Sequence, residues 1–403
     1  MSERRVEIDW LRIIAMLAVF IFHCTRFFDP HGWHLKNAEQ SSALFRVTIS
    51  LIMPWIMELF FLVSGFGAWY ALKSRTAGRF LLERVKRLLI PLYTVGLFIL
   101  LPPQFYFDQA TNSGYSGAFI EILPAYFTHF RPPGITKWFE MLPLPFAGHL
   151  WFLECLFLIS LFTLPLLLWL KNDRGRQWIT TLADWSNRPG GLFLFAIPLL
   201  LTRILSGGFL QAQSCWGGFV WYLIYFVMGY VIAAEKRFTE AFRKSAPICL
   251  VLWLASAVLH LYLLMDILNY SLSPHQHMSF MYTLFQCTWT INGWSAVALL
   301  IGFGAVYLKS ENRVLDYGNE AVLPFYLIHQ TIILCVGYFV IKWDMGILSK
   351  FLIITPISLI LVLAPYELLV RRFNAMRFLF GMNPKPKAPR PIATDPIAIA
   401  PRQ

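Results

Sequence analysis

The sequence predicts an all-α, polytopic membrane protein with about ten transmembrane helices and both termini in the cytosol. Hydrophobic residues make up 57% of the 403 residues and charged residues only 14%, whereas a soluble domain carries about 25% charged residues. Apolar runs of about 20 residues, the length needed to cross a bilayer, recur along the chain. Lysine and arginine concentrate in alternate segments between these runs, a distribution that sets orientation in a membrane.

A single transmembrane domain is predicted over residues 1–372, with ten candidate spans. The fifth span is short and contains Pro198, and the eighth is long enough to be tilted or to begin before the membrane. The spans are 9–28, 47–72, 85–104, 149–170, 191–207, 217–234, 246–266, 279–308, 321–341 and 348–370.

The positive charge favours one side of this predicted bundle. All but eight of the 34 Lys and Arg residues lie in the N-terminus, in 73–87, 171–188, 235–244 and 309–320, and in the C-terminal tail. This alternation follows the positive-inside rule and places both termini in the cytosol. Topology therefore explains the net charge of +12, and we expect the lipid bilayer as a partner and no nucleic acid. The eight exceptions are Arg26, Lys36, Arg46, Arg131, Lys137, Arg203, Lys342 and Lys350.

Two segments lie outside the predicted spans. Residues 105–148 form a long outer segment rich in Tyr, Phe, Pro and Gly, in which we expect a short interfacial helix around 116–130. Its aromatic residues could stack on sugar faces, although an interfacial aromatic belt explains them equally well. The tail over 383–403 is rich in proline, and we expect it to be disordered in the cytosol.

The first span carries an arginine and a histidine, Arg12 and His23, eleven residues apart. Eleven helical steps return to nearly the same face, about 16 Å further along the axis. Ionisable side chains inside a span are costly and mark functional sites by default. A neutral imidazole in the outer half of the membrane could act as general base on a hydroxyl. The alternative is a histidine that only hydrogen-bonds to a neighbouring helix.

A second pair of arginines, Arg84 and Arg87, stands at the start of the third span. Their spacing of three residues places both on one helix face. Together with Arg12 they could form a cluster on the inner side for an anionic group, because guanidinium forks suit phosphate. The alternative is ordinary anchoring by positive residues on the cytosolic side.

Further polar residues occur inside apolar runs. Glu58 lies in the middle of the second span, Glu154 near the outer end of the fourth, and His149 and His329 at outer and middle depth. Each carboxyl must be protonated, paired or exposed to water. So many ionisable groups at these depths indicate a polar cavity that opens outward.

Other classes of site find little support. His31 and His34 lie in an outer loop without Asp, Glu or Cys at ligand spacing, so we expect no metal site. Nucleotide-binding fingerprints of the Rossmann and Walker types are absent. The chain therefore does not resemble a nucleotide-driven pump.

With these residues in hand, the chain resembles the integral-membrane acyltransferase family 3. The resemblance rests on an ordered set of motifs: a D-x-L-R start with an Arg-x10-His pair, an FFxxSGF-like stretch, an Arg-x-x-Arg pair before proline, an H-L-W-F-L patch and a late Y-L-x-H. The matching residues are Asp9, Arg12 and His23, Phe60 to Phe66, Arg84, Arg87 and Pro91, His149 to Leu153, and Tyr326 to His329.

Within this family the chain is most similar to the branch that succinylates periplasmic glucans. The stretches that carry this similarity are FHCTRFFDPHGWHLKNAEQSS, MELFFLVSGF and GHLWFL. One departure is Gln330, which follows His329 where another histidine is expected.

The resemblance implies acyl transfer across a bacterial inner membrane. Acyl-CoA, either succinyl-CoA or acetyl-CoA, would act as co-substrate from the cytosol, with no permanently bound cofactor. His23 would deprotonate a hydroxyl of an extracytoplasmic glycan. Our own inference adds that Glu154 or Glu58 orients the imidazole or bonds the acceptor. The residues expected to hold the phosphates are Arg12, Arg84 and Arg87, and those expected to contact substrate are His149, Trp151, His329 and His34.

Two other functions compete with this one. The first is a transporter or flippase for a glycan or lipid, with the buried charges along its path and no acyl chemistry. The second is a structural subunit that uses polar residues for helix association. The structural reading does not explain why an inner arginine and an outer histidine share one helix face.

Overall fold

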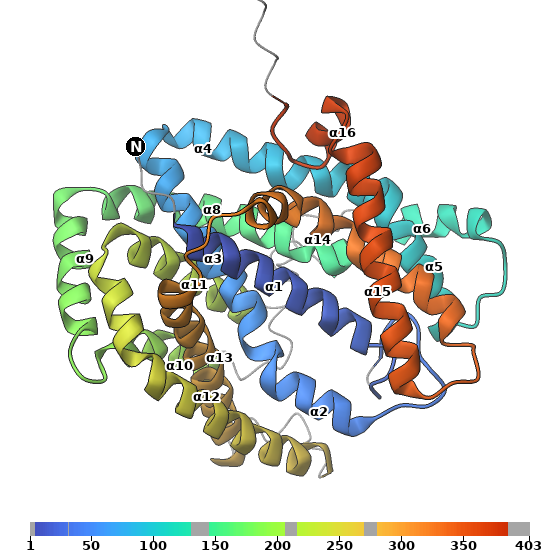
Figure 1. Ribbon diagram of the computed structural model, residues 1–403, viewed down its shortest axis with the longest axis horizontal. Helices are drawn as coiled ribbons and strands as arrows, with labels where there is room; N and C mark the ends of the chain where they lie inside the picture. Colours follow the sequence, from blue (N-terminus) through green and yellow to red (C-terminus); the bar gives the residue numbers. More distant parts are fainter. Residues whose placement is uncertain (1–4, 31, 130–144, 206–215, 270–279, 386–403) are drawn as a thin grey trace, which may run out of the picture.

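The computed structural model describes residues 5–30, 32–129, 145–205, 216–269 and 280–385, and these residues form helices and connecting segments without a β-strand (Figure 1). Two shorter apolar helices, Gly191–Leu205 and Gly218–Ala234, occupy the fifth and sixth predicted spans. The prediction of an all-α polytopic membrane protein is confirmed. Within the described residues, eight helices are long and apolar enough to cross a membrane: Val6–Thr25, Met53–Ser74, Ala77–Asn112, Gly148–Leu170, Arg237–Leu263, Thr283–Tyr307, Arg313–Val340 and Ile347–Val370.

The described residues form the following helical elements in chain order. The α-helices are α1 (Val6–Thr25), α2 (Ser42–Leu51), α3 (Met53–Ser74), α4 (Ala77–Arg84), α5 (Leu101–Asn112), α6 (Leu123–His129), α8 (Trp151–Leu170), α9 (Asp173–Ser186), α10 (Ala196–Leu205), α11 (Trp216–Ala234), α12 (Arg237–Asn269), α13 (Phe280–Tyr307), α14 (Arg313–Val340), α15 (Ile347–Pro365) and α16 (Asn374–Leu379). Shorter π- and 3₁₀-helical turns are η1 (Val85–Leu89), η2 (Leu92–Leu100), η3 (Phe119–Ile122), η4 (Pro145–Leu150), η5 (Gly191–Phe195) and η7 (Tyr366–Val370).

Two predicted spans differ from the helices that the structure contains. The second, 47–72, is divided at Ile52 into α2 and α3, and Pro54 stands in the first turn of α3, where its missing N–H costs nothing. The third, 85–104, is the middle of a longer helical rod over Ala77–Asn112. The outer segment 105–148 contains the end of α5, the turn η3, the short helix α6 and the start of η4. Residues 130–144 of this segment and the tail beyond residue 385 lie outside the described residues.

Helix α1 lies at the centre of the molecule. It crosses the middle of the ribbon in Figure 1, and it contacts α3, α13, α14 and α15. Leu11 and Ala15 on this helix are completely buried. The helix that carries Arg12 and His23 therefore packs against four other helices, and both of these side chains are half-buried.

The rod from α4 to α5 contains two π-helical segments, η1 and η2, separated by Pro91. Proline lacks the N–H that a regular α-helix needs at an interior position, which favours a local change of register. π-helical turns occur frequently at functional sites. Here they lie between Arg84 and Gln104, which stand on opposite halves of the rod.

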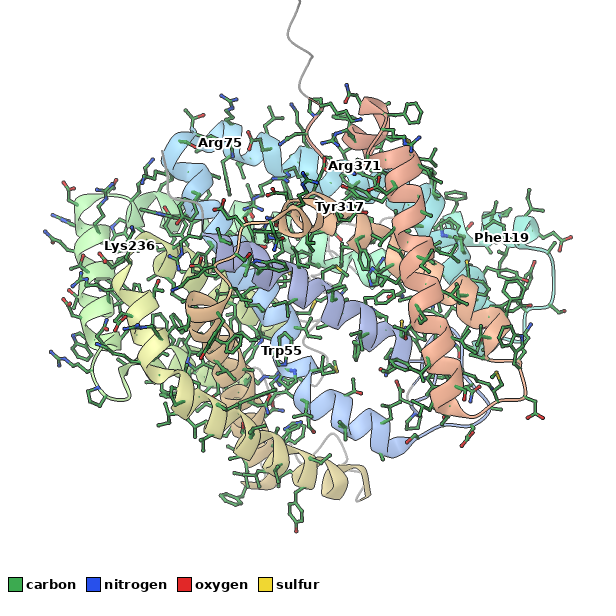
Figure 2. The ribbon with its side chains drawn as sticks, in the orientation of Figure 1. Trp55, Arg75, Phe119, Lys236, Tyr317 and Arg371 are labelled. Atoms are coloured by element: carbon green, nitrogen blue, oxygen red, sulfur yellow. The ribbon has the colours of Figure 1, made fainter. Side chains whose placement is uncertain are left out.

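Charged side chains are unevenly distributed over the surface. In Figure 2 the labelled cations Arg75, Lys236 and Arg371 lie on the upper and left sides of the molecule, whereas Phe119 lies at the right. We call the side of these cations the inner side, following the predicted orientation, and the opposite side the outer side. The orientation itself stays a prediction.

Helices α3 and α11 approach each other closely at two glycines. A Cβ atom on Gly229 would lie 1.9 Å from the carbonyl oxygen of Leu62, and one on Gly65 would lie 2.0 Å from that of Phe226. Small residues of this kind let helix backbones pack closely inside a membrane.

We predict that Gly229→Val lowers the thermal unfolding midpoint of the detergent-purified protein, because the two backbones must move apart. Overpacking of this kind typically costs about 1–3 kcal/mol. The matched control is Gly67→Ala on α3, where an added Cβ has no atom within 4 Å. Equal midpoints for the two variants would contradict the close packing of α3 on α11.

Candidate active site

Helices α1 and α14 and the turn η4 bring three histidines together on the outer half of α1. His23 comes from α1, His149 from the turn η4 before α8, and His329 from α14. His23 Nδ1 lies 3.1 Å from His329 Nε2, and the rings of His149 and His329 have centroids 5.3 Å apart. His149 and His329 are buried, whereas His23 is half-buried. His23 is therefore the member of the group that a substrate can reach.

The hydrogen bonds assign the protons on two of these rings. His329 Nδ1 lies 2.7 Å from the carbonyl oxygen of Tyr326, which can only accept, so Nδ1 carries the proton. Neutral His329 then has its lone pair on Nε2, where it accepts a hydrogen bond from His23 Nδ1. This leaves the lone pair of His23 on Nε2, free to take a proton from a hydroxyl. The contact with His329 thus fixes the orientation and the tautomer of the His23 ring.

His149 has a different role because both of its ring nitrogens are engaged. Nε2 donates to the carbonyl oxygen of Leu327 at 3.1 Å, and Nδ1 accepts from the Gln104 amide at 3.1 Å. The hydroxyl of Tyr326 in turn donates to the backbone carbonyl of His149 at 2.5 Å. His149 therefore ties η4, α5 and α14 together and positions the segment that carries His329.

Gln104 connects this group to the outer loop. Its amide nitrogen lies 2.8 Å from the hydroxyl of Thr331, and its carbonyl oxygen accepts from Gln330 at 3.1 Å. Gln330 also lies 3.2 Å from His34 Nε2. The glutamine that stands where another histidine was expected therefore bridges His34 to Gln104.

The loop after α1 packs against His23. The ring of Trp33 stacks on that of His23, with centroids 6.3 Å apart and an angle of 18°. His34 follows directly and lies 3.6 Å from a carboxylate oxygen of Asp108 on α5. Trp33 and His34 thus form the outer wall of the site.

For the acyl transfer expected from the sequence, we predict that Gln104→Leu lowers kcat about tenfold and leaves the KM for acyl-CoA unchanged. The substitution leaves His149 Nδ1 without its donor, and an unsatisfied buried polar group costs about 1–3 kcal/mol. Gln109→Leu on the same helix is the control, because Gln109 makes no side-chain hydrogen bond in the described part of the chain. A parallel rise in KM, or equal activity of both variants, would argue against a positioning role.

A basic cavity of about 240 Å³ lies at the inner end of α1. Arg12, Arg84 and Arg87 line it as predicted, and Arg75 joins them. Arg12 donates to the Asn319 side chain at 3.2 Å, and Arg84 lies over the ring of Phe80 at 5.0 Å. Glu83, the carboxylate among the residues that line the cavity, pairs with Arg75 at 2.8 Å. The cavity therefore has an excess of positive charge.

An apolar chamber of about 120 Å³ adjoins this basic cavity. The two share Arg12, Val63, Ser64, Val322 and Leu323 in their walls. Beyond these, the chamber is lined by Phe60, Phe152 and Tyr326, and the ring of Tyr326 lies 5.9 Å from that of His329. A narrow apolar passage thus leads from the arginines toward the histidines, along the roughly 16 Å that separate Arg12 and His23 on the helix.

Three of the residues selected from sequence lie apart from this group. Glu154 accepts a hydrogen bond from the Tyr93 hydroxyl at 3.0 Å, and Glu58 accepts one from the Trp221 indole at 3.1 Å. Trp151 packs against the rings of Phe61 and Tyr222. The group that contacts His23 is His329 rather than either glutamate. The sequence predicts how deep Glu58 and Glu154 lie in the membrane. It does not predict toward which neighbouring helix α3 and α8 direct these side chains.

Sequence reasoning missed Gln104, Arg75 and Asn319. Gln104 stands at the end of the predicted third span, and its position inside the apolar stretch LLPPQFYF is the signal that could have identified it. Arg75 belongs to the basic segment 73–87, where the sequence does not distinguish it from the residues that set topology. Asn319 carries no signal of its own, because its contact with Arg12 depends on how α14 packs against α1.

Among the described residues, no set of three or more His, Cys, Asp or Glu side chains could hold a metal ion. The histidines are instead bonded to one another, to backbone carbonyls and to amide side chains. The arrangement is that of an oriented base beside a passage from a cationic cavity.

Comparison with known proteins identifies the class. Residues 5–367 match the family model described as an acyltransferase domain, so the chain belongs to this family and is a membrane acyltransferase. It is similar to the glucans biosynthesis protein C of Escherichia coli strain K12, with 22% identity over 401 residues, covering 95% of this chain and 96% of that protein. The protein of the same name from strain SMS-3-5 is similar to the same extent. No solved structure matches the chain. The family predicted from the motifs is confirmed.

Proposed function

We propose that the protein transfers a succinyl or acetyl group from cytosolic acyl-CoA to a hydroxyl of a periplasmic glucan, with His23 as general base. One observation carries the proposal: the arginine cavity and His23 stand at opposite ends of α1 and are linked by an apolar chamber that ends beside His329. This is the layout that a donor with a charged head, a narrow arm and a reactive end requires.

On the donor side, the guanidinium groups of Arg12, Arg84 and Arg87 would hold the phosphates of CoA from the cytosol. Arginine suits this task because its planar fork bonds phosphate oxygens in pairs. The pantetheine arm would enter the chamber between Phe60 and Phe152. The thioester would then lie near Tyr326 and the histidines.

On the acceptor side, a sugar hydroxyl would approach His23 from the outer side. As its oxygen attacks the thioester carbonyl, His23 Nε2 takes the hydroxyl proton. The carbon–sulfur bond breaks, and the CoA thiolate takes that proton from the imidazolium as it leaves. The products are an acyl ester on the sugar and free CoA thiol, and His23 returns to its neutral form.

The choice of acceptor and membrane is supported by the relatives. The Escherichia coli proteins are named for glucan biosynthesis and align with this chain over nearly its whole length. We extend this to a glucan acceptor and to the bacterial inner membrane. A donor in the cytosol and an acceptor on the other side of the membrane must meet at a site that is reached from both sides. Helix α1 is long enough to cross the membrane and carries Arg12 and His23 toward its two ends.

The test is turnover by the purified full-length protein in detergent. It would be incubated with acetyl-CoA or succinyl-CoA and gluco-oligosaccharides, and free thiol and acylated sugar would be measured. We expect one donor to give an acyl ester in equal amount to the thiol released. If a folded sample binds neither donor and forms no ester, the proposal is wrong and the transporter alternative gains support.

A further inference from the structure

We infer that a second cavity, on the outer side of the molecule, binds the acceptor as a neutral, polyhydroxylated glycan. The cavity has a volume of about 840 Å³. It lies between the loop after α1, the end of α5, the end of α14 and the start of α15, with Lys36, Thr111, Tyr338 and Trp343 among its walls. The inference rests on the proposed function for the identity of the acceptor and adds the place where the acceptor is held.

The cavity lies just beyond the histidine group, because three elements run from one to the other. Thr111 is seven residues past Gln104 on α5, and Tyr338 is nine residues past His329 on α14, about 10 and 13 Å along their helices. The loop that places Trp33 on His23 continues directly into the wall at Lys36. A chain of sugars that is bound in the cavity would therefore have to extend about 10–13 Å toward the histidine group to bring its end to His23.

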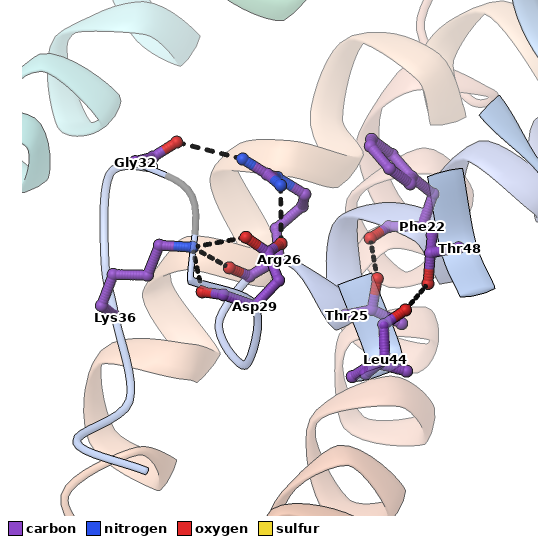
Figure 3. Close-up of polar contacts among 8 residues, drawn as sticks. All are labelled: Phe22, Thr25, Arg26, Asp29, Gly32, Lys36, Leu44 and Thr48. Atoms are coloured by element: carbon purple, nitrogen blue, oxygen red, sulfur yellow. Dashed lines mark hydrogen bonds and ion pairs between the residues drawn. The ribbon is translucent and has the colours of Figure 1, made fainter. Parts of the chain in front are cut away.

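The loop after α1 forms one wall of the cavity. Ion pairs of Arg26 and Lys36 with the buried Asp29 hold this loop in place (Figure 3). Arg26 donates to the Asp29 carboxylate at 2.6 Å, and Lys36 donates to the other oxygen of that carboxylate at 3.1 Å and to the Arg26 carbonyl at 2.7 Å. Asp29 is only 3% exposed. Burial lowers the pKa of Arg26 and of Lys36, and the Asp29 carboxylate opposes this change. A wall fixed before binding loses little conformational freedom when a ligand arrives.

A second buried polar contact fixes the opposite edge of the cavity. The Lys350 ammonium, 6% exposed, donates to the Asn37 side chain at 2.7 Å and to the carbonyl oxygen of Ile341 at 2.9 Å. The backbone N–H of Asn37 donates to the carbonyl of Phe27 at 2.9 Å. The loop, α15 and the end of α14 are therefore joined around the cavity rather than merely adjacent.

The chemistry of the walls indicates the class of ligand. Trp343 is 48% exposed and presents a ring on which the C–H face of a sugar can stack. Glu39 and Asp344 offer acceptors, and Lys342, whose ammonium lies 3.5 Å from the centre of the Tyr338 ring, offers donors. Charges of both signs are interspersed, so the cavity does not favour a strongly anionic ligand. An aromatic platform with mixed donors and acceptors suits the hydroxyl groups of a neutral glycan.

The experiment measures binding of gluco-oligosaccharides to the detergent-purified full-length protein without acyl-CoA. We expect Trp343→Ala to weaken binding about tenfold, the loss of one aromatic contact. Phe339→Ala is the matched control, because Phe339 stands near the same end of α14, is 64% exposed and does not line the cavity. Thermal unfolding of both variants checks that they are folded, and binding of acyl-CoA should be the same in all three proteins.

Equal affinities of wild type and Trp343→Ala, or no binding by wild type, would overturn the inference. So would an equal loss in Trp343→Ala and Phe339→Ala. The proposed reaction with acyl-CoA is tested separately from the glycan cavity. A protein that binds glycan through Trp343 but never binds acyl-CoA would contradict the reaction and support the cavity.

Discussion

Replacing His23 by glutamine is expected to lower kcat by about 100- to 10,000-fold, the usual contribution of a general base. The glutamine amide can donate to His329 Nε2 as the imidazole does, so the contact between α1 and α14 can persist. It cannot take a proton from a hydroxyl. The measurement is thiol release and ester formation at saturating acyl-CoA and glycan.

The control for this variant is a buried histidine outside the site. His260 on α12 lies 3.3 Å from the Thr288 hydroxyl and is completely buried. His260→Gln should keep activity within a few-fold of wild type, and both variants should bind acyl-CoA normally. Normal transfer by His23→Gln would remove His23 from the chemistry.

The second large effect is expected at the inner cavity, in the double variant Arg84→Gln/Arg87→Gln. Hydrogen bonds to charged groups contribute about 1.5–3 kcal/mol each, and 1.4 kcal/mol is a factor of ten. The KM for acyl-CoA should therefore rise by about 100-fold or more, with a much smaller change in kcat. Binding by the wild-type protein should also weaken as salt is added, because the Arg75 side chain in the cavity wall is 39% exposed and salt screens exposed charges.

Arg79→Gln is the matched control for the arginine pair. Arg79 lies on α4 like Arg84, but its side chain is 73% exposed and does not line the cavity. The variant removes one positive charge from the same segment and should leave the KM for acyl-CoA unchanged. If the double variant behaves like Arg79→Gln, Arg84 and Arg87 serve only to anchor the protein on the cytosolic side.

Much of the architecture could be predicted because it follows from composition. The length and frequency of the apolar runs predict an all-α bundle, and the helices of the structure fall where those runs lie. The π-helical turns η1 and η2 could not be predicted, because the change of register depends on what packs around Pro91. The division at Ile52 has a signal in the sequence, because proline favours the first turn of a helix and Pro54 stands in the first turn of α3.

For the candidate site, the sequence predicts only how far apart residues lie along the axis of one helix. Arg12 and His23 share a helix, so their separation follows from helical geometry, and the structure places them beside the basic cavity and the histidine group respectively. Helical geometry along α1 does not predict which residue of another helix contacts His23. His329, Glu58 and Glu154 all have suitable depths, and only the rotation of α14, α3 and α8 decides which of them faces α1.

The most direct test of the account uses proteoliposomes in which acyl-CoA and glycan are on opposite sides of the membrane. A labelled acyl-CoA would be supplied on the inner side of the protein, with gluco-oligosaccharides only on the outer side. The account predicts that labelled ester appears on the outer glycan with the wild-type protein and is lost with His23→Gln. Ester that forms only when donor and glycan share one compartment, or that forms equally well with His23→Gln, would contradict it.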